Sequence, residues 1–189
     1  MKPETRKDEI IITAAKLFKE KGYSAVTMRD LATAMGIKAA SLYNHISSKQ
    51  EILKEIIISL AEAFTSGMNA IIHSDISNIE KLKKIVELHV NITSLNTNGM
   101  ASLNNDWMHL EDQLEYYLKL RADYEDSFRD IIKQGIKDNE ILKESPDVIL
   151  FSMLSTLRSL YIWIPKKDDL NQEELSASLS KILINGINK

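Results

Sequence analysis

The sequence predicts an all-α protein. Leu, Ile, Lys, Glu and Ala dominate long stretches of the 189 residues, whereas only six glycines and three prolines are present. Apolar residues recur at the three- and four-residue spacing of helices with one buried face, and the every-second-residue alternation of strands is absent. We therefore expect helices packed into bundles, with an N-terminal three-helix module followed by a larger helical region.

The first fifty residues have the pattern of a helix-turn-helix. Three helices are predicted, separated near Gly22 and Gly36, because glycine at these positions can end a helix or form a tight turn. Thr27, followed three residues later by Asp30, is a capping pattern that begins the second helix. The predicted helices cover residues 5–21, 28–34 and 38–46.

A long helix follows, and five more are expected after it. Ser48 to Glu51 has the form of a capping box, so a helix is predicted from there to about Ile72. Polar or proline-containing breaks separate the remaining helical patterns. These later helices are predicted at 78–95, 101–118, 120–138, 147–163 and 171–187.

Charge is divided unevenly between the two regions. Residues 1–50 contain nine Lys and Arg against five Asp and Glu, a net charge of +4, which leaves −7 for residues 51–189. A basic segment attached to an acidic body suggests an anion-binding module, and nucleic acid is the obvious anion. The alternative interpretation is an ordinary solvated helix surface, because net charge bears on association and not on fold.

The third predicted helix has a face suited to a DNA major groove. Leu42 and Ile46 share one side and should be buried, so Ala40 and Asn44 point away from the core. Small side chains permit close approach, while Asn, His and Lys reach base edges or phosphates. This face is flanked by Tyr43 and His45 and begins at Lys38. As an alternative, Tyr43 could cover the helical bundle and His45 could be an ordinary surface residue.

Lys49 is placed unfavourably for a simple surface lysine. It lies in the first turn of the predicted long helix, where the positive end of the helix dipole disfavours a cation. A phosphate docking at the same helix N-terminus would explain it. A solvated lysine, which costs a few tenths of a kcal/mol, is the alternative.

The stretch from Ile11 to Leu53 resembles the N-terminal domain of the TetR family of transcriptional regulators. The matching features are LF-x-EKGY, TM-x-DLA, MGI, SLY-x-H and SK-x-E-x-L. Lys38 departs from the Ser or Thr usual in the family, and Ile46 replaces the usual Phe. The resemblance and the outward face together give the candidate DNA contacts Thr27, Lys38, Ala39, Ala40, Tyr43, Asn44, His45 and Lys49.

The resemblance implies a DNA-binding domain over 1–50 and a ligand-binding and dimerisation domain over 51–189. Within the latter, Trp107 to Trp163 resembles regulators of fatty-acid and sterol degradation that sense acyl-coenzyme A thioesters, with FRDIIKQG among the matching features and Arg158 as a departure. The expected ligand is therefore a small hydrophobic molecule or an acyl-coenzyme A. Candidate ligand contacts are Trp107, Arg121, Tyr124, Phe128, Arg158 and Tyr161.

The aromatic residues of this region also have a plainer interpretation, since they could form core or dimer interface rather than pocket walls. Arg158 lies in an otherwise apolar or hydroxylated segment, where an unpaired guanidinium would cost several kcal/mol. It should pair with a carboxylate, in the same subunit or across a dimer, or meet an anionic ligand. Arg121, in a segment of mixed charge, is expected to be solvated unless it faces a pocket mouth.

Two apolar helices favour a homodimer. The helix at 147–163 is apolar around much of its circumference, and the helix at 171–187 has one apolar stripe of Leu175, Leu179, Ile182 and Leu183. A two-fold four-helix interface would cover both. Such a dimer places its recognition helices about 34–36 Å apart and implies a palindromic operator.

Other functional classes find little support. The chain has no cysteine, nucleotide-binding glycine motif or H-E-x-x-H, and its four histidines fall on separate predicted helices, so we expect no enzyme, cofactor or metal site. There is no uninterrupted apolar run of about 18 residues and no signal-peptide core, which favours a cytoplasmic protein without a membrane span. A helical protein–protein adaptor that does not bind DNA is the alternative function.

Overall fold

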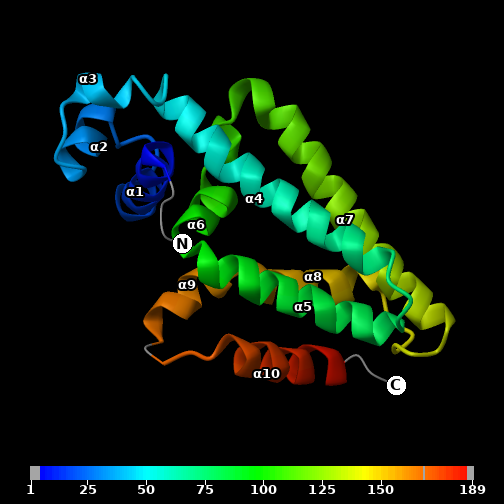
Figure 1. The fold of residues 1–189 in the computed structure, drawn as a ribbon. Helices are drawn as coiled ribbons and strands as arrows, with labels where there is room; N and C mark the ends of the chain where they lie inside the picture. Colours follow the sequence, from blue (N-terminus) through cyan, green and yellow to red (C-terminus); the bar gives the residue numbers. More distant parts are fainter. Residues whose placement is uncertain (1–4, 168, 187–189) are drawn as a thin grey trace. The chain divides into compact units, whose positions relative to one another are not determined.

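The structure, a computed structural model, describes residues 5–167 and 169–186, and these residues form helices and no β-strand, as the sequence predicted (Figure 1). In chain order the helices are α1 (Arg6–Lys21), α2 (Met28–Ala34), α3 (Ala39–Leu42), α4 (Lys49–Ile72), α5 (Asn78–Leu95), α6 (Thr97–Asn105), η1 (Trp107–His109), η2 (Glu111–Gln113), α7 (Leu114–Lys137), α8 (Pro146–Arg158), α9 (Leu160–Trp163), η3 (Ile164–Lys166) and α10 (Gln172–Asn185).

The chain divides into two compact units. Unit 1 comprises Met1–Ala61 and Asn96–Leu118, and unit 2 comprises Glu62–Leu95 and Lys119–Lys189. The helices α4 and α7 each begin in unit 1 and continue into unit 2.

Local capping explains why α2 begins where the sequence predicted. The Thr27 hydroxyl accepts a hydrogen bond from the Asp30 backbone N–H (3.2 Å), and the Asp30 carboxylate accepts one from the Thr27 backbone N–H (2.8 Å). The turns before and after α2 contain Gly22 and Gly36 with φ of 83° and 66°, a region that glycine enters without steric cost. The predicted range 28–34 is confirmed.

The third predicted helix is shorter than expected. Regular α-helix covers only Ala39–Leu42 of the predicted 38–46, and the chain then continues as a turn in which the N–H groups of His45 and Ile46 both donate to the Leu42 carbonyl. Asn and His are weak helix formers, so the segment does not propagate once Leu42 and Ile46 are buried.

The start of α4 uses only half of the predicted capping box. The Ser48 hydroxyl accepts from the Glu51 backbone N–H (3.0 Å), as expected, but the Glu51 carboxylate accepts from the backbone N–H of Ser47 (2.7 Å) instead of Ser48. The helix still begins at Lys49 and ends at Ile72.

The prediction of one helix over 101–118 is wrong. The helix α6 ends at Asn105, and two short 3-10 turns follow before α7 begins at Leu114. Leu110, between these turns, is completely buried, and Glu111 adopts a positive φ of 47°. The segment around the buried Leu110 therefore interrupts the helix, although the helical spacing of apolar residues continues through it.

Later boundaries also shift. The helix predicted at 120–138 is the second part of α7, which starts earlier, and the helix predicted at 147–163 is interrupted at Ser159, between α8 and α9. The last predicted helix corresponds to α10, and Ile187 lies outside the described residues.

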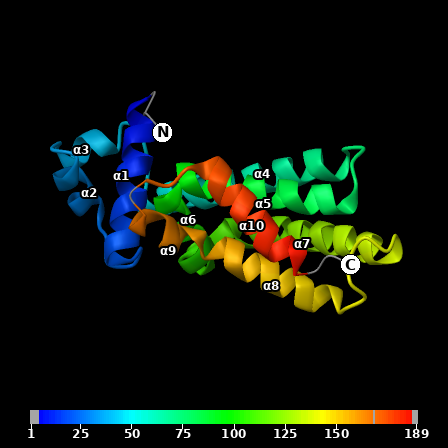
Figure 2. The ribbon, with the colours of Figure 1, turned by 90° about the horizontal axis from the view of Figure 1, so that it is seen from below.

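In unit 2, α10 runs alongside α5 (Figures 1 and 2), and α5 also contacts α8. The buried face of α5 contains Leu82, Ile85, Val86 and Val90, which are completely buried. In unit 1, α6 lies alongside α1.

Two segments, Lys49–Ile72 and Pro146–Lys166, are long and apolar enough to cross a membrane by length and composition alone. No such segment is expected from the sequence, which has no uninterrupted apolar run of about 18 residues. Buried helices of globular proteins pass the same test, and a third of each apolar window is buried in this structure. These helices therefore do not indicate a membrane protein.

Three polar side chains are also buried on α5: Asn78, His89 and Thr93. His89 is only 3% exposed, and its Nε2 lies 2.8 Å from the hydroxyl of Tyr124 on α7. Burial, with a smaller contribution from the charge of Arg158, lowers the pKa of His89 to about 3. Burial also raises the pKa of the Tyr124 hydroxyl, so both side chains are neutral at pH 7.

The buried histidine should make the protein sensitive to acid. Its pKa is about 3 in the folded chain and 6.5 in the unfolded chain, so between these values only the unfolded state takes up the proton. From pH 7.5 to pH 5 we expect His89 to account for a loss of about 2 kcal/mol in the free energy of unfolding, at about 1.4 kcal/mol per pH unit below 6.5. Chemical denaturation of wild type and His89→Gln at both pH values measures this loss.

The variant should lose correspondingly less stability than wild type, whereas His73→Gln, at an exposed position, should behave like wild type. Equal losses in wild type and His89→Gln would contradict the assignment of a neutral buried imidazole.

Candidate DNA-binding site and ligand-binding core

The candidate DNA-contacting residues form an exposed surface at α3. Leu42 and Ile46 are 0% and 2% exposed, and they hold the short helix and its following turn against the rest of unit 1. The side chains that follow Leu42 and precede Ile46 are exposed, and Tyr43 is 55% exposed. Around α3 the exposed members of the predicted set are Lys38, Ala40, Tyr43, Asn44 and His45, while Ala39 is half-buried.

Thr27 is exposed at the start of α2, but its hydroxyl is already engaged. Besides accepting from the Asp30 N–H, it donates to an Asp30 carboxylate oxygen at 2.6 Å. Hydrogen bonds from Thr27 lower the pKa of Asp30, which keeps that carboxylate ionised. Thr27 therefore fixes the N-terminus of α2, and any phosphate would compete with Asp30 for its proton.

Lys49 has contacts that the sequence analysis missed. Its Nζ donates to the carbonyl oxygen of Tyr23 at 2.8 Å, with the Ser24 carbonyl at 3.5 Å. The same ammonium group lies 4.3 Å from the centroid of the Tyr23 ring, a cation–π contact. These contacts give the lysine a structural reason to occupy the first turn of α4, and DNA contact by Lys49 stays a prediction.

Tyr23 also connects the helix-turn-helix to the turn after α6. Its hydroxyl donates to the side-chain oxygen of Gln50 at 2.5 Å, and the Gln50 amide donates to the backbone carbonyl of His109. The Tyr23 and His109 rings lie 5.2 Å apart between centroids. Burial raises the pKa of the Tyr23 hydroxyl, which keeps the proton available for donation. We call this set of contacts, together with Lys49, the Tyr23 junction.

In unit 2, Arg158 is paired within the subunit. Its Nη2 lies 2.6 Å from Glu125 Oε1, and Arg121 Nε approaches the same oxygen at 3.1 Å. Burial would raise the pKa of Glu125, but the two guanidinium groups outweigh it and lower that pKa. The sequence expectation of a carboxylate partner for Arg158 is met by Glu125, whereas Arg121 is half-buried and ion-paired rather than freely solvated.

Two of the predicted ligand-contacting aromatic residues belong to the core of unit 2. Phe128 is fully buried and Tyr124 is 7% exposed. The Tyr124 ring meets the edge of Phe64 at 5.9 Å and lies 5.8 Å from the His89 ring. Phe64 and His89 were not among the predicted residues, although the apolar neighbours of His89 on α5 suggest burial.

The other two predicted aromatic residues lie elsewhere in the chain. Trp107 belongs to unit 1, where it stacks on Tyr117 at 6.0 Å. Tyr161 is half-buried on α9 in unit 2. In unit 2, Arg121, Arg158 and Tyr124 come together around Glu125 and His89.

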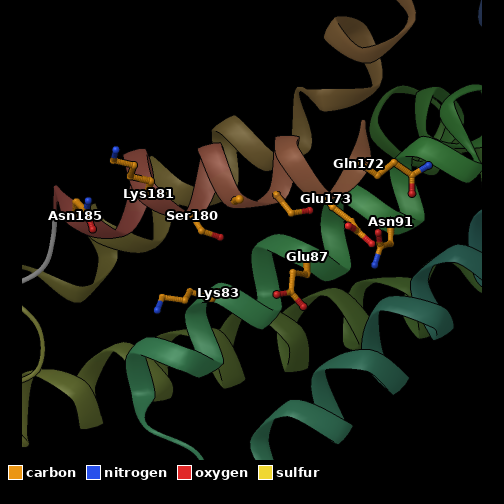
Figure 3. Close-up of a pocket in the computed structure, with 10 residues that line it drawn as sticks. Lys83, Glu87, Asn91, Gln172, Glu173, Ser180, Lys181 and Asn185 are labelled. Carbon is orange, nitrogen blue, oxygen red and sulfur yellow. The ribbon is translucent and has the colours of Figure 1, made fainter. Parts of the chain in front are cut away.

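Two grooves lie in unit 2. A polar groove of about 740 Å³ lies between α5 and α10, and its lining includes Lys83, Glu87 and Asn91 on α5. Figure 3 shows the Ser180 side chain of α10 pointing towards α5 and the Lys181 side chain pointing away from it. None of the predicted ligand-contacting residues lines this groove.

The second groove, of about 480 Å³, has an apolar floor that includes Leu160, Trp163 and Leu175 and hydroxyl groups from α8. It also contains none of the predicted ligand contacts. Among the described residues, no group of three or more His, Asp or Glu side chains could hold a metal ion.

Comparison with known proteins gives matches over both regions of the chain. The family model described as bacterial regulatory proteins of the tetR family matches residues 10–56, and the tetracyclin repressor-like C-terminal domain matches residues 75–187. The HTH-type transcriptional repressor KstR2 of Rhodococcus jostii is 25% identical over 151 residues, which cover 79% of this chain and 74% of that protein.

Two further relatives cover different parts of the molecule. IcaR of Staphylococcus aureus, the negative transcriptional regulator of the icaADBC biofilm operon, is 47% identical over 51 residues, 27% of each chain. The solved structure of the ketosteroid transcriptional regulator KstR2 of Mycobacterium tuberculosis is 21% identical and superimposes with a TM-score of 0.91, covering 100% of this chain and 97% of that one.

These matches agree with the geometry of α2 and α3 and give no support to an adaptor without DNA binding. The relatives are transcriptional regulators, and the second family model alone spans more than half of the sequence. The chain therefore belongs to the TetR family of helix-turn-helix transcriptional regulators.

Proposed function

We propose that this regulator represses transcription by binding a palindromic operator as a homodimer in the cytoplasm, and that a small hydrophobic or acyl-coenzyme A ligand releases it. In this proposal residues 1–50 bind DNA, and residues 51–189 bind the ligand and form the dimer. The observation that supports DNA binding most directly is the exposed surface of α3, because its small and hydrogen-bonding side chains are backed by the buried Leu42 and Ile46.

Exposed apolar side chains support dimerisation through α8 to α10. Val148 and Phe151 on α8 are 63% and 73% exposed, and Ile182 on α10 is 70% exposed. Ile162 and Trp163 on α9 add to this surface. Because these side chains belong to neighbouring helices in one unit, a second copy related by a two-fold axis could bury them in a four-helix interface.

The ion cluster of Arg121, Glu125 and Arg158 supports an anionic ligand. Two guanidinium groups share one carboxylate oxygen, so the three side chains have a net charge of +1 in a half-buried position. An acyl-coenzyme A combines anionic phosphates with an apolar chain, which fits this charge beside the aromatic core residues Tyr124 and Phe128. Ligand binding would act by moving α4, whose first residue is Lys49.

DNA binding can be tested through its salt dependence. We expect Lys49→Ala to lower the slope of log K against log salt by about one unit for a duplex from the region upstream of its own gene, since one phosphate contact is removed. Fluorescence anisotropy over a salt series measures the slope, and Lys181→Ala on α10 serves as the matched control with no expected change. A lower affinity with an unchanged slope would mean that Lys49 only holds the Tyr23 junction.

Dimerisation can be tested by placing a charge on the exposed apolar surface. Phe151→Glu should convert the dimer to a monomer, because a carboxylate would be buried without a partner in the proposed interface. Sedimentation velocity measures the change. Leu95→Glu, at another exposed apolar position (61%), should remain dimeric. A Phe151→Glu protein that stays dimeric would exclude this surface as the interface.

The ligand class can be tested by thermal shift with acyl-coenzyme A thioesters, free coenzyme A and unrelated small hydrophobic molecules. A thioester present at 100 times its Kd should stabilise the protein by about 2.7 kcal/mol. Arg158→Gln should reduce this effect, while Lys119→Gln, which removes an exposed ion pair with Asp123, should not. If no thioester stabilises the wild type, the acyl-coenzyme A proposal is wrong.

A further inference from the structure

Three polar atoms on α5 are buried without a hydrogen-bond partner within the described part of the chain. They are His89 Nδ1, Thr93 Oγ1 and Ser94 Oγ. His89 is 3% exposed and Thr93 is completely buried. Residues four apart lie one helical turn from each other on the same face, so His89 and Thr93 are neighbours along α5. Buried polar groups are normally paired, and each exception needs a physical reason.

The helix itself could have satisfied the threonine. A Thr hydroxyl inside a helix commonly donates to the carbonyl four residues earlier. Thr33 does so with the Arg29 carbonyl at 2.9 Å, and Thr156 does so with the Ser152 carbonyl at 3.2 Å. Thr93 makes no such bond to His89, so its hydroxyl is free to meet a group that is not part of α5.

Aromatic rings flank the histidine. The Phe64 ring lies 4.7 Å from the His89 ring between centroids, and Tyr124 meets both rings edge-on. The hydrogen bond between Nε2 and the Tyr124 hydroxyl fixes the imidazole and leaves Nδ1 as its unpaired atom. The two unpaired atoms of His89 and Thr93 therefore belong to an aromatic and aliphatic environment.

The charge state of this environment limits what can bind there. The imidazole is neutral at pH 7, and the charge of Arg158, which contributes to its low pKa, is already paired with Glu125. A neutral imidazole nitrogen and a hydroxyl can pair with one uncharged oxygen, as donor or as acceptor. A charged oxygen at this depth would need a direct cationic partner, and Arg158 is committed to Glu125.

We propose that His89 Nδ1 and Thr93 Oγ1 recognise an uncharged oxygen, a ketone or a hydroxyl, on an otherwise apolar part of the ligand of this regulator. The inference rests on the proposed ligand response and adds the chemistry of a second recognition point, separate from the cationic cluster at Glu125. The free energy of unfolding of the ligand-free protein is lowered by these two atoms, because they lack hydrogen-bond partners until the ligand binds.

Three probes with nearly the same skeleton test the proposal: ethylbenzene, acetophenone and 1-phenylethanol. A purely apolar core would bind them in order of hydrophobicity, with ethylbenzene tightest. We expect acetophenone or 1-phenylethanol to bind tightest to the full-length protein, because only these place an oxygen against His89 and Thr93. Titrations followed by NMR signals of the Thr93 methyl group and the His89 ring measure both affinity and location.

Two variants supply the controls. Thr93→Val keeps the shape of the side chain and removes the hydroxyl. In this variant ethylbenzene should bind tightest, as measured at the His89 ring. The Tm should rise by about 2–4 °C, because a buried hydroxyl without a partner is removed. Thr33→Val, where the lost hydroxyl is exposed and bonded to its own helix, should change neither the order of the probes nor the Tm appreciably. His89→Phe tests the imidazole independently, with the Thr93 methyl group as its reporter.

Binding of the upstream duplex, measured on the same samples, separates the two proposals. If the duplex binds but ethylbenzene remains the tightest probe, or no probe moves the signals of His89 and Thr93, the recognition of an uncharged oxygen is overturned and the regulator proposal stands. If the oxygen-containing probes bind tightest in wild type and not in Thr93→Val, the inference holds even where no duplex binds.

Discussion

The burial of Leu42 and Ile46 is the constraint on which the DNA-binding surface depends. A helix of four residues is far too short to be stable alone, because the conformational entropy lost in nucleating a helix exceeds the free energy gained from the hydrogen bonds of a single turn. Both side chains are excluded from water, and truncation of a buried Leu or Ile to Ala costs about 2–5 kcal/mol. These two anchors therefore fix the orientation of Ala40 and Asn44, and the outward surface exists only as long as they stay buried.

The Tyr23 junction is a second constraint on unit 1. Lys49 and Gln50, the first residues of α4, hold the backbone and hydroxyl of Tyr23 at the end of the α1 segment, and Gln50 also holds the His109 carbonyl. The same helix α4 continues without interruption to Phe64, beside the buried His89. Under the proposed ligand response, α4 is the element that contributes residues to both places.

The sequence predicted those parts of the fold that depend on local interactions. The range 28–34 follows from the reciprocal bonds of Thr27 and Asp30, and the range 78–95 follows from the helical spacing of apolar residues between polar breaks. The pairing of Arg158 was foreseeable because desolvation of an unpaired guanidinium is costly, although Glu125, 33 positions away, could not be named as its partner.

The parts that were missed depend on contacts between distant residues. Leu110 is buried between two 3-10 turns, which breaks a helix that its spacing alone would continue. The attachment of Lys49 to the Tyr23 carbonyl joins residues 26 positions apart, so the dipole argument identified an unusual lysine but not its partner. His89 gave no chemical signal in the sequence, since only the fold shows that Tyr124 satisfies one ring nitrogen and leaves the other unpaired.

The central claim is that the outward face of α3 enters the groove of duplex DNA. The most direct measurement compares the affinity of wild type and Ala40→Glu for the upstream duplex in dilute buffer, because Ala40 is exposed and does not belong to the core. We expect a loss of about a hundredfold or more from bulk and negative charge against phosphates, and no loss for Ala122→Glu at an exposed position of α7. Wild-type affinity in Ala40→Glu, with both proteins folded, would contradict the central claim.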